Sequence, residues 1–479
     1  MNKLYLFGIG GTGSRVIKAL TMLLACGIDI NNYEIVPIII DPDAANGDVT
    51  RTVQLLRNYK QIRSDIGLTA EGSSFFKTNI EELSPGQNYK FDLGDTNNKK
   101  FGEYINVNAL DQSNEALVRL LFSEANLEAD MEVGFKGNPN IGSVVLNRFV
   151  DSEEFQDLAN NFKAGDRIFI VSSIFGGTGA AGFPLLLKNI RNVPSTFPNY
   201  KLLQDAPIGA VTVLPYFNVN VEEESSIDGA TFVSKAKAAL NYYDVNVSGN
   251  NSLNSFYYIA DNHTTSQENN EGGTGQKNQA HFVELASALA VVDFCNESSM
   301  QLECTNGKAE NPMYKEFGIQ NDALVFGLDN LAPATGHLLN VPLSQFTLFT
   351  LYMSNKLNDA TGQNWAKNLG LNSIIGSSFY SHLSQFISDY VDWLDEMGKN
   401  QRSFLPYNLK VTDSNLFDFI NGYKADSGFL DKGGKSYGRF DYMLSKVDKE
   451  IDGKSSGNKR LLDLFFLATL ELIKTKYKF

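Results

Sequence analysis

Residues 167–184 read RIFIVSSIFGGTGAAGFP and contain a strand pattern, a glycine loop and the start of a helix. The first part, residues 168–171, is a run of β-branched and aromatic residues, which is typical of a strand buried in a parallel sheet. The glycine-rich residues 176–182 follow, and the apolar spacing beyond them predicts a helix in which Pro184 is tolerated because it lies near the first turn. A strand is therefore expected to lead through a glycine loop into a helix.

Such a loop has the chemistry of a phosphate site. At the N-terminus of a helix the backbone N–H groups lack helical partners and lie at the positive end of the helix dipole. Glycines carry no side chain that would keep a phosphate at a distance. The same residues also suit a tight turn in which the glycines serve only packing. Other parts of the chain have to decide between these two interpretations.

The chain opens with a second unit of the same kind. Residues 3–7 predict a strand, residues 8–14 (GIGGTGS) a glycine loop, and apolar residues at helical spacing follow. Residues 35–40 predict another buried strand, and Asp41 and Asp43 come at its carboxyl end, where open α/β sheets bind ligands. On its own this unit fits a Rossmann dinucleotide site or the ATP loop of ThiF-type enzymes.

Two such loops in one chain resemble the tubulin/FtsZ superfamily of GTP-binding, filament-forming proteins. The sequence GGTGAAG at residues 176–182 is similar to the GGGTGTG signature of that family, and residues 8–14 match its first phosphate loop. Residues 207–217 (PIGAVTVLPYF) resemble the FtsZ strand that ends in a Pro-Phe pair beside the ribose. These landmarks come in the order of the family, and the resemblance covers a little over half of the chain.

The resemblance implies both a fold and a ligand. The implied fold is α/β, with a Rossmann-type, tubulin/FtsZ-like GTPase domain at residues 1–275, a central helix at 276–296 and a helix-rich C-terminal domain at 297–479. The implied ligands are GTP and Mg²⁺, with the phosphates held between the two loops. The residues implied in nucleotide binding are Gly10, Gly11, Thr12, Gly13, Ser14, Asp41, Asp43, Gly176, Gly177, Thr178, Gly179, Ala180 and Asn278.

One residue near the start of the central helix is expected to read the base. Asn278 best matches the guanine contact of the family, with Asp261 and Asn262 as rivals. An amide or carboxylate oxygen suits this role because guanine displays N1–H and N2–H₂ donors. His281, which comes soon after, fits a hydrogen-bonded histidine on a helix better than a catalytic base.

The match is weaker after the central helix. In the family the next loop supplies acidic residues that reach the γ-phosphate held by the neighbouring subunit, but residues 296–313 lack the NxDxxD pattern of FtsZ. Glu297 and Glu303 are the candidate catalytic carboxylates. The resemblance therefore implies a bacterial-type, tubulin-like protein that self-associates into GTP-dependent filaments and hydrolyses GTP slowly, with the neighbouring subunit completing the site. Nothing in the sequence identifies another protein partner.

The rest of the chain is less specific. Residues 48–151 are longer than the matching part of FtsZ, with helices predicted at 52–66 and 114–127. Residues 135–142 are a turn cluster that folds over the nucleotide or caps a sheet edge. The helices predicted beyond the central one lie at 343–357, 379–397, 411–423 and 460–474.

Composition limits the other classes of function. The 479 residues are 43% hydrophobic and 11% aromatic, which excludes global disorder, and the net charge of −14 argues against a nucleic-acid-binding surface. Cys26, Cys295 and Cys304 have no CxxC spacing, so we expect reduced thiols and no metal site. No window reaches the roughly 18 apolar residues of a membrane span and no signal-peptide pattern opens the chain, so we expect a cytoplasmic protein.

Two other functions stay open at this point. A ThiF-like adenylating enzyme would use Asp41, Asp43 and Arg51, which follow the first loop much as the Asp and Arg residues of that family do. Its second glycine loop would then lack a purpose, and no CxxC zinc site supports it. The third class is a scaffold in a multi-protein bacterial system, either gated by nucleotide or with glycine loops that are only turns.

Overall fold

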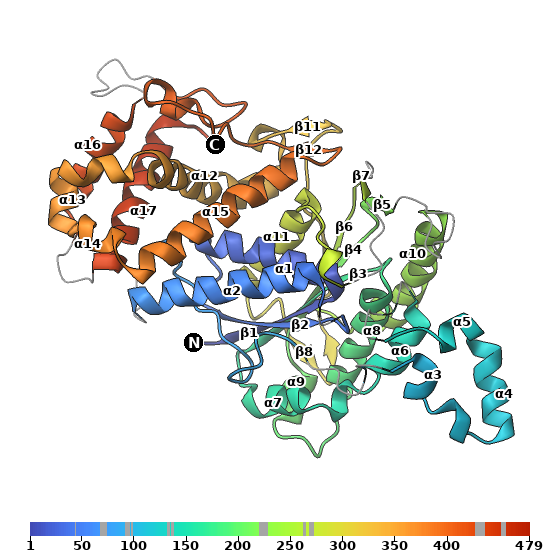
Figure 1. The fold of residues 1–479 in the computed structure, drawn as a ribbon. Coiled ribbons are helices and arrows are strands. Elements are labelled where there is room, and N and C mark those ends of the chain that lie inside the picture. Colours follow the sequence, from blue (N-terminus) through green and yellow to red (C-terminus); the bar gives the residue numbers. More distant parts are fainter. Residues whose placement is uncertain are drawn as a thin grey trace.

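The computed structural model describes most of the chain (Figure 1). The described residues are 1–43, 45–67, 74–91, 96, 99–131, 135, 138–219, 229–261, 265–267, 273–426, 436–451 and 457–479. They form an α/β fold in which a parallel sheet lies between two sets of helices, with a larger group of C-terminal helices beyond one set (Figure 1). The mixed α/β class and the helix-rich C-terminal portion predicted from the sequence are confirmed.

The core sheet has six strands, all parallel, in the order β10, β6, β4, β3, β1, β2. They are β1 (Lys3–Ile9), β2 (Glu34–Ile40), β3 (Arg167–Ser173), β4 (Ile208–Val213), β6 (Ser255–Ile259) and β10 (Met313–Lys315). All seven residues of β3 are buried, as expected for a strand covered on both faces. Because the strands are parallel, their carboxyl ends meet at one edge of the sheet.

The sheet reverses its direction of growth between β1 and β3. Phe7 of β1 pairs with Ile38 of β2 on one side and with Ile170 of β3 on the other. The chain therefore runs from β1 outward to β2, and later from β3 outward in the opposite direction to β4. Ligands of open α/β sheets bind in the crevice at such a switch point, outside the carboxyl ends of the strands.

Helices cover both faces of the sheet (Figure 1). On one face lie α1 (Gly10–Ala25), α2 (Gly47–Ile66) and α11 (Phe282–Asn296), and on the other lie α6 (Pro139–Leu146), α7 (Glu153–Asn161), α8 (Gly177–Arg191) and α9 (Tyr200–Gln204). Helix α1 packs against both α2 and α11, and α6 packs against α8. The turn cluster predicted over 135–142 is only partly correct, because residues 139–142 form the start of α6, and residues 136–137 lie outside the described residues. A Cβ on Gly142 would lie 3.0 Å from the carbonyl oxygen of Gly177, so α6 packs beside the second glycine loop.

The central helix starts later than residue 276, where the sequence predicted it. Helix α11 begins at Phe282, and nearly all of its residues are buried. Nδ1 of His281 accepts a hydrogen bond from the N–H of Val283 at 3.1 Å, and the N–H of His281 donates to Oε2 of Glu284 at 3.1 Å. These two bonds satisfy backbone N–H groups at the helix start, so the helix begins after His281.

The chain beyond α11 is mainly helical. Its helices are α12 (Pro333–Asn355), α13 (Asn364–Leu369), α14 (Leu371–Ile375), α15 (Ser378–Gly398), α16 (Tyr437–Val447) and α17 (Gly457–Lys476). The short strands β11 (Val325–Phe326) and β12 (Ser403–Phe404) pair with each other. Residues 411–423, predicted as a short α-helix, contain only a 3₁₀ turn at Asp413–Asp418. Phe75 from the N-terminal part packs onto Phe346 and Phe349 of α12, so the hydrophobic core is continuous across both parts.

Several further elements lie around this core. They are α3 (Phe101–Tyr104), α4 (Gln112–Leu121), α5 (Glu124–Leu127), α10 (Gly229–Tyr243), β5 (Phe217–Val219), β7 (Thr265–Gln267), β8 (Cys304–Thr305) and β9 (Lys308–Ala309). The helix predicted over 114–127 is split into α4 and α5, because Oγ of Ser123 accepts a bond from the N–H of Asn126 and caps a new helix. No helix in the described part of the chain is long and apolar enough to cross a membrane.

Candidate functional site

The two glycine loops meet at the switch point of the sheet. Gly10 begins α1 directly after β1, and Gly177 begins α8 shortly after β3. A Cβ atom placed on Gly10 would lie 3.6 Å from the Cβ of Thr178 and 3.8 Å from the backbone nitrogen of Gly179. Gly10 has a φ of +73°, a conformation that favours glycine. The first turns of the two helices therefore face each other.

The glycines of the loops fall into two groups. A Cβ on Gly13 would lie 2.5 Å from the carbonyl carbon of Gly8, and one on Gly179 would lie 2.6 Å from the carbonyl oxygen of Ser173. These glycines are required by packing. A Cβ on Gly11 would meet nothing nearer than Nη1 of Arg15 at 3.6 Å. Packing therefore does not require a glycine at position 11.

The N-termini of both helices lack the usual side-chain cap. Ile9 and Gly176 occupy the N-cap positions of α1 and α8, and neither makes a side-chain capping bond. By contrast Oδ1 of Asn46 caps α2 by accepting from the N–H of Asp48 at 2.9 Å. The first backbone N–H groups of α1 and α8 are thus left to an anion or to solvent, and both helix dipoles point their positive ends at the same place.

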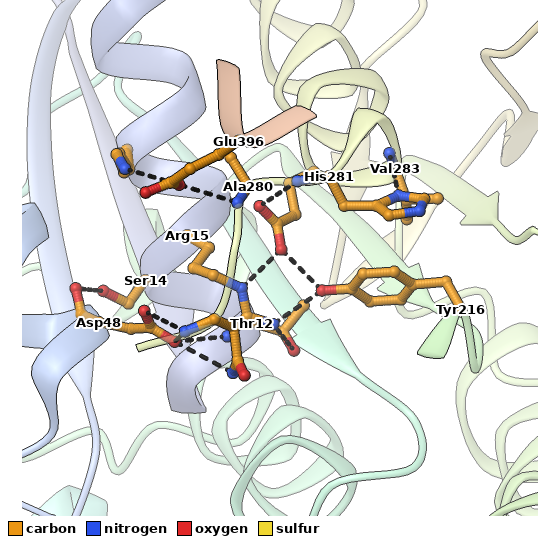
Figure 2. A network of polar contacts seen from close by, with 12 residues as sticks. Thr12, Ser14, Arg15, Asp48, Tyr216, Ala280, His281, Val283 and Glu396 are labelled. Carbon is orange, nitrogen blue, oxygen red and sulfur yellow. Dashed lines mark hydrogen bonds and ion pairs between the residues drawn. The ribbon is translucent and has the colours of Figure 1, made fainter. Parts of the chain in front are cut away.

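A buried ion-pair network lies beneath the first loop (Figure 2). Arg15, which is 4% exposed, donates from Nε to Oε1 of Glu284 at 2.5 Å and from Nη1 to Oδ2 of Asp48 at 2.8 Å. Its Nη2 donates to the hydroxyl of Tyr216 at 2.7 Å, and that hydroxyl donates to Oε1 of Glu284 at 2.8 Å. Burial raises the pKa of Tyr216 well above its ordinary value, so the hydroxyl keeps its proton.

This network fixes the helix of the first loop against three other elements. Asp48 lies in α2, Glu284 lies in the first turn of α11, and Tyr216 follows β4. No sequence motif singled out Arg15, Asp48 or Glu284 as site residues. The available signal was the charge of Arg15 directly after a glycine loop, at the start of a helix whose later residues are mainly apolar, since a buried arginine requires carboxylate partners.

Asp41 and Asp43 lie at the carboxyl end of β2, beside the first loop, as predicted. Oδ1 of Asp41 accepts from the N–H of Asp43 at 3.0 Å, and its Oδ2 accepts from Nδ2 of Asn46 at 3.3 Å. Burial raises the pKa of Asp41 to about 7, and the charges of Asp43 and Asp48 add to this effect. Asp43 itself accepts from the N–H of Gly273 at 2.6 Å and from that of Ala45 at 3.0 Å. Both carboxylate oxygens of Asp43 are thus engaged by backbone N–H groups.

The predicted base-reading residue lies close to the same network. The N–H of Asn278 donates to Oδ1 of Asp48 at 3.1 Å, and its Nδ2 donates to Oδ2 of Asp48 at 3.2 Å. The amide nitrogen is therefore engaged with the protein, and the carbonyl oxygen is the end that can accept from a ligand. The rival Asp261 pairs with Nη1 of Arg402 at 2.7 Å, and the other rival, Asn262, lies outside the described residues.

His281 has a structural position rather than a catalytic one. It is 1% exposed, and its Nδ1 accepts from the N–H of Val283, so the neutral ring carries its proton on Nε2. Burial lowers the pKa of His281 to about 4, with Arg15 and Arg402 adding to the effect and Asp261 opposing it. The histidine therefore stays neutral at physiological pH. Its Nδ1 is hydrogen-bonded as predicted, but its buried Nε2 has no hydrogen-bond partner among the described residues.

The candidate catalytic glutamates lie away from the two loops. Glu297 directly follows α11, whose other end carries the Arg15 contact through Glu284, and a helix of this length spans about 22 Å. Glu297 pairs with Lys315, whose Nζ also lies 2.8 Å from Oδ2 of Asp293. Glu303 is exposed. Within one chain, neither glutamate is brought to the loops.

No metal centre is built from protein side chains in the described ranges. No group of three or more His, Cys, Asp or Glu residues there could hold a metal ion. The three cysteines are all free thiols, with Cys26 and Cys295 buried.

The comparisons with known proteins concern part of the chain. No protein-family model and no curated protein matches this chain. Solved structures of CetZ proteins, which belong to the tubulin/FtsZ family and come from archaea, are similar to it. CetZ from Methanosaeta thermophila strain DSM 6194 aligns with 14% identity over 54% of this chain and 46% of that chain, with a TM-score of 0.28.

Two further CetZ structures show a likeness of the same extent. The GTPγS-bound protofilament of CetZ2 from Haloferax volcanii aligns with 15% identity over 54% of this chain and 49% of that chain, at a TM-score of 0.26. The GDP-bound monomer of CetZ1 from Haloferax volcanii aligns with 15% identity over 54% and 51%, also at 0.26. The aligned part is about half of the length of each of these proteins.

Proposed function

We propose that this chain binds GTP, with the phosphates between residues 8–14 and 176–182. The observation that carries this proposal is the approach of Gly10 to Thr178 and Gly179, because it directs two uncapped helix N-termini at one point beside the switch between β1 and β3. The glycines of a single turn could be required for packing alone. Two facing helix N-termini offer backbone N–H groups from both sides, which suits an extended polyphosphate.

The binding energy has to come from several contacts. One helix terminus stabilises an anion by about 0.3–2 kcal/mol, whereas micromolar affinity requires roughly 8 kcal/mol. The phosphates would therefore be held by many backbone N–H groups, from Gly10 to Ser14 and from Gly176 to Ala180. The carbonyl oxygen of Asn278 would accept from guanine. Mg²⁺ would enter with the phosphates, next to Asp41 and Asp43.

Binding of GTP, ATP and NAD to the purified protein tests this proposal. We expect GTP to bind most tightly, and Gly177→Val to abolish binding because a side chain there occupies phosphate space. Gly11→Val is a second variant, since its Cβ makes only ordinary contacts and should leave the fold intact. The matched control is Gly362→Val, where a Cβ meets nothing within 4 Å. Unchanged GTP affinity in folded Gly177→Val and Gly11→Val proteins would overturn the site.

The same titrations address the other functions. A preference for ATP would favour the adenylating enzyme, and binding of no nucleotide would favour the scaffold. The adenylating alternative needs Arg51, but the Arg51 guanidinium is engaged with Oδ1 of Asp48 at 2.7 Å and with Oε1 of Glu396 at 2.8 Å. This pairing weighs against that role.

We further propose that the chain assembles end to end into filaments with GTP. Glu297 and Glu303 lie at the far end of α11 from the loops, so they could reach a nucleotide only in a neighbouring copy. Such a head-to-tail contact is heterologous and generates an open polymer. Glu297 would have to leave Lys315 to act on a phosphate, which supports slow hydrolysis.

Electron microscopy and sedimentation with and without GTP and Mg²⁺ test the assembly. We expect linear polymers with GTP, and more of them as salt rises, because the net charge of −14 opposes association at low ionic strength. A protein that binds GTP but stays monomeric at every concentration would remove the cytoskeletal part of the proposal. The chain would then be a nucleotide-gated partner of another component.

A further inference from the structure

The segment that leads into the central helix, residues 276–281, is held in part by the C-terminal helices. The N–H of Ala280 donates to Oε2 of Glu396 at 2.9 Å, and the carbonyl oxygen of Ala280 accepts from Nδ2 of Asn400 at 2.8 Å. Glu396 lies in the last turn of α15, and Asn400 comes just after that helix. Figure 2 shows Glu396 directed at the backbone of Ala280. Both backbone groups of Ala280 are thus engaged by side chains that lie 116 and 120 positions away in the sequence.

The carboxylate of Glu396 also contacts two basic side chains of the N-terminal part. Its Oε1 accepts from Nη1 of Arg51 in α2 at 2.8 Å, and its Oε2 lies 3.5 Å from Nζ of Lys18 in α1. The Glu396 side chain is 19% exposed, so water and salt screen these contacts less than they screen a surface pair. One carboxylate therefore contacts α1, α2 and residues 276–281 at the same time.

Arg51 connects this carboxylate to the residue proposed to read the base. Nη2 of Arg51 donates to the backbone carbonyl oxygen of Asn278 at 2.6 Å and to Oδ1 of Asp48 at 2.7 Å. Asp48 in turn accepts from the N–H and from Nδ2 of Asn278. Because Glu396 pairs with the other terminal nitrogen of Arg51, it fixes the guanidinium that holds Asn278. The position of Asn278 therefore depends on Glu396 both through Arg51 and through Ala280.

Helix α15 is itself fixed by contacts outside residues 276–281. It lies beside α2 and runs in the opposite direction (Figure 1). Glu396 near its end meets Arg51 near the start of α2, and the carbonyl oxygen of His382 near its start accepts from Nδ2 of Asn58 farther along α2 at 3.1 Å. Between these contacts Phe386 is completely buried against aromatic rings of the N-terminal part. The end of α15 is thus a stable support for the segment before α11.

We propose that Glu396 is a positioning residue for the base contact of the GTP site and acts on Asn278 through Arg51 and Ala280. This inference rests on the proposed function, because it concerns how the same site distinguishes guanine from adenine. A hydrogen bond to a base contributes most when the accepting oxygen is already held in place, since a segment that is ordered only on binding weakens the complex. The C-terminal helices thereby help to determine which nucleotide binds.

The ratio of the GTP and ATP affinities tests this role. We expect Glu396→Ala to weaken GTP binding about fivefold and ATP binding less than about twofold, because the phosphate contacts stay in place. The matched control is Asp448→Ala, which removes a carboxylate that is 5% exposed and pairs with Arg460 at 2.7 Å among the C-terminal helices. It should leave the ratio unchanged. A folded Glu396→Ala protein that keeps the wild-type ratio would overturn the positioning role.

A double variant shows whether Glu396 acts through Asn278. In a protein that already carries Asn278→Ala, the change Glu396→Ala should leave the ratio of the two affinities as it is, because no amide remains to be positioned. A further fivefold loss of GTP affinity in that background would contradict the proposal, since Glu396 would then act on the nucleotide by another route.

Hydrogen exchange gives a measurement on the wild-type protein. Because coupling between two sites is reciprocal, GTP should slow amide exchange at the end of α15, in residues 392–400, as well as in residues 276–281. A wild-type protein that prefers GTP but shows no change at residues 392–400 would overturn the positioning role alone. A wild-type protein with no preference for GTP over ATP would instead overturn the proposed base contact, and this inference with it.

Discussion

Nε of Arg15 lies 2.5 Å from Oε1 of Glu284, and this contact joins the helix of the first glycine loop to the first turn of the central helix. Both side chains are buried, at 4% and 1% exposure. Glu284 also accepts from the hydroxyl of Tyr216 and from the N–H of His281, so a single carboxylate satisfies three buried donors. The position of the first loop therefore depends on an ion pair from a residue 269 positions away in the sequence.

Replacing Glu284 should be strongly destabilising. Glu284→Ala leaves Arg15 with Asp48 as its sole carboxylate partner and removes the acceptor of Tyr216, and breaking a buried pair in this way costs about 3–5 kcal/mol. Urea denaturation measures the loss. Glu115→Ala, which breaks the exposed pair with Arg119, is the control and should change the free energy of unfolding by about 0.5 kcal/mol or less.

A double variant separates the ion pair from simple loss of packing. In Arg15→Met/Glu284→Leu both charges are replaced by apolar groups, and Asp48 keeps its ion pair with Arg51 at 2.7 Å, so no carboxylate is left without a cation. We expect this protein to be more stable than Glu284→Ala alone. If the double variant is less stable than Glu284→Ala, Glu284 stabilises the fold by something other than its ion pair with Arg15.

Asn278→Ala should reduce nucleotide affinity in a base-specific way. It removes the carbonyl oxygen proposed to accept from guanine but leaves both glycine loops in place, so GTP should bind about tenfold more weakly while ATP is little changed. Isothermal titration with both nucleotides measures this. Gln279→Ala, at the exposed neighbouring position, is the control. An equal loss for GTP and ATP would assign the base contact to another residue.

His281 should make the protein less stable in acid. Its folded pKa of about 4 lies below its ordinary value, so the unfolded chain binds a proton that the folded chain does not, and stability is lost as the pH falls from about 6.5 to about 4. The effect reaches up to about 3 kcal/mol. His281→Asn keeps a capping oxygen and should flatten this part of the curve. His337→Asn, at an exposed histidine, should not.

Asp41 should make the protein less stable as the pH rises, the opposite of the effect of His281. Its folded pKa of about 7 is raised, so its contribution is present at low pH and is lost as the pH rises through 7. Asp41→Asn should therefore raise the melting temperature relative to wild type more at pH 8 than at pH 5. Asp359→Asn, at a side chain that is 73% exposed, is the control. A gain that is the same at both pH values would contradict the raised pKa of Asp41.

Local features of the sequence were sufficient to predict most elements of the sheet. Alternation of apolar runs with glycine loops placed β1, β2 and β3 and the helices that follow them, because strands buried on both faces need continuous hydrophobic residues and because glycine permits the turn of the backbone at Gly10. The order of strand, loop and helix also predicted that Asp41 lies at a strand end. These features depend on residues that are adjacent in the sequence, so they can be predicted from the sequence alone.

The tertiary structure decided which segments that are distant in the sequence come into contact. Pairing of β1 with β3 brings Gly10 to Thr178, although 168 residues separate them, and this approach is what supports the proposed phosphate site over two unrelated turns. The same is true of Arg15, whose partners come from α2, α11 and the segment after β4. Charge burial and strand pairing depend on contacts between distant segments, and a linear pattern of residue types carries no record of those distances.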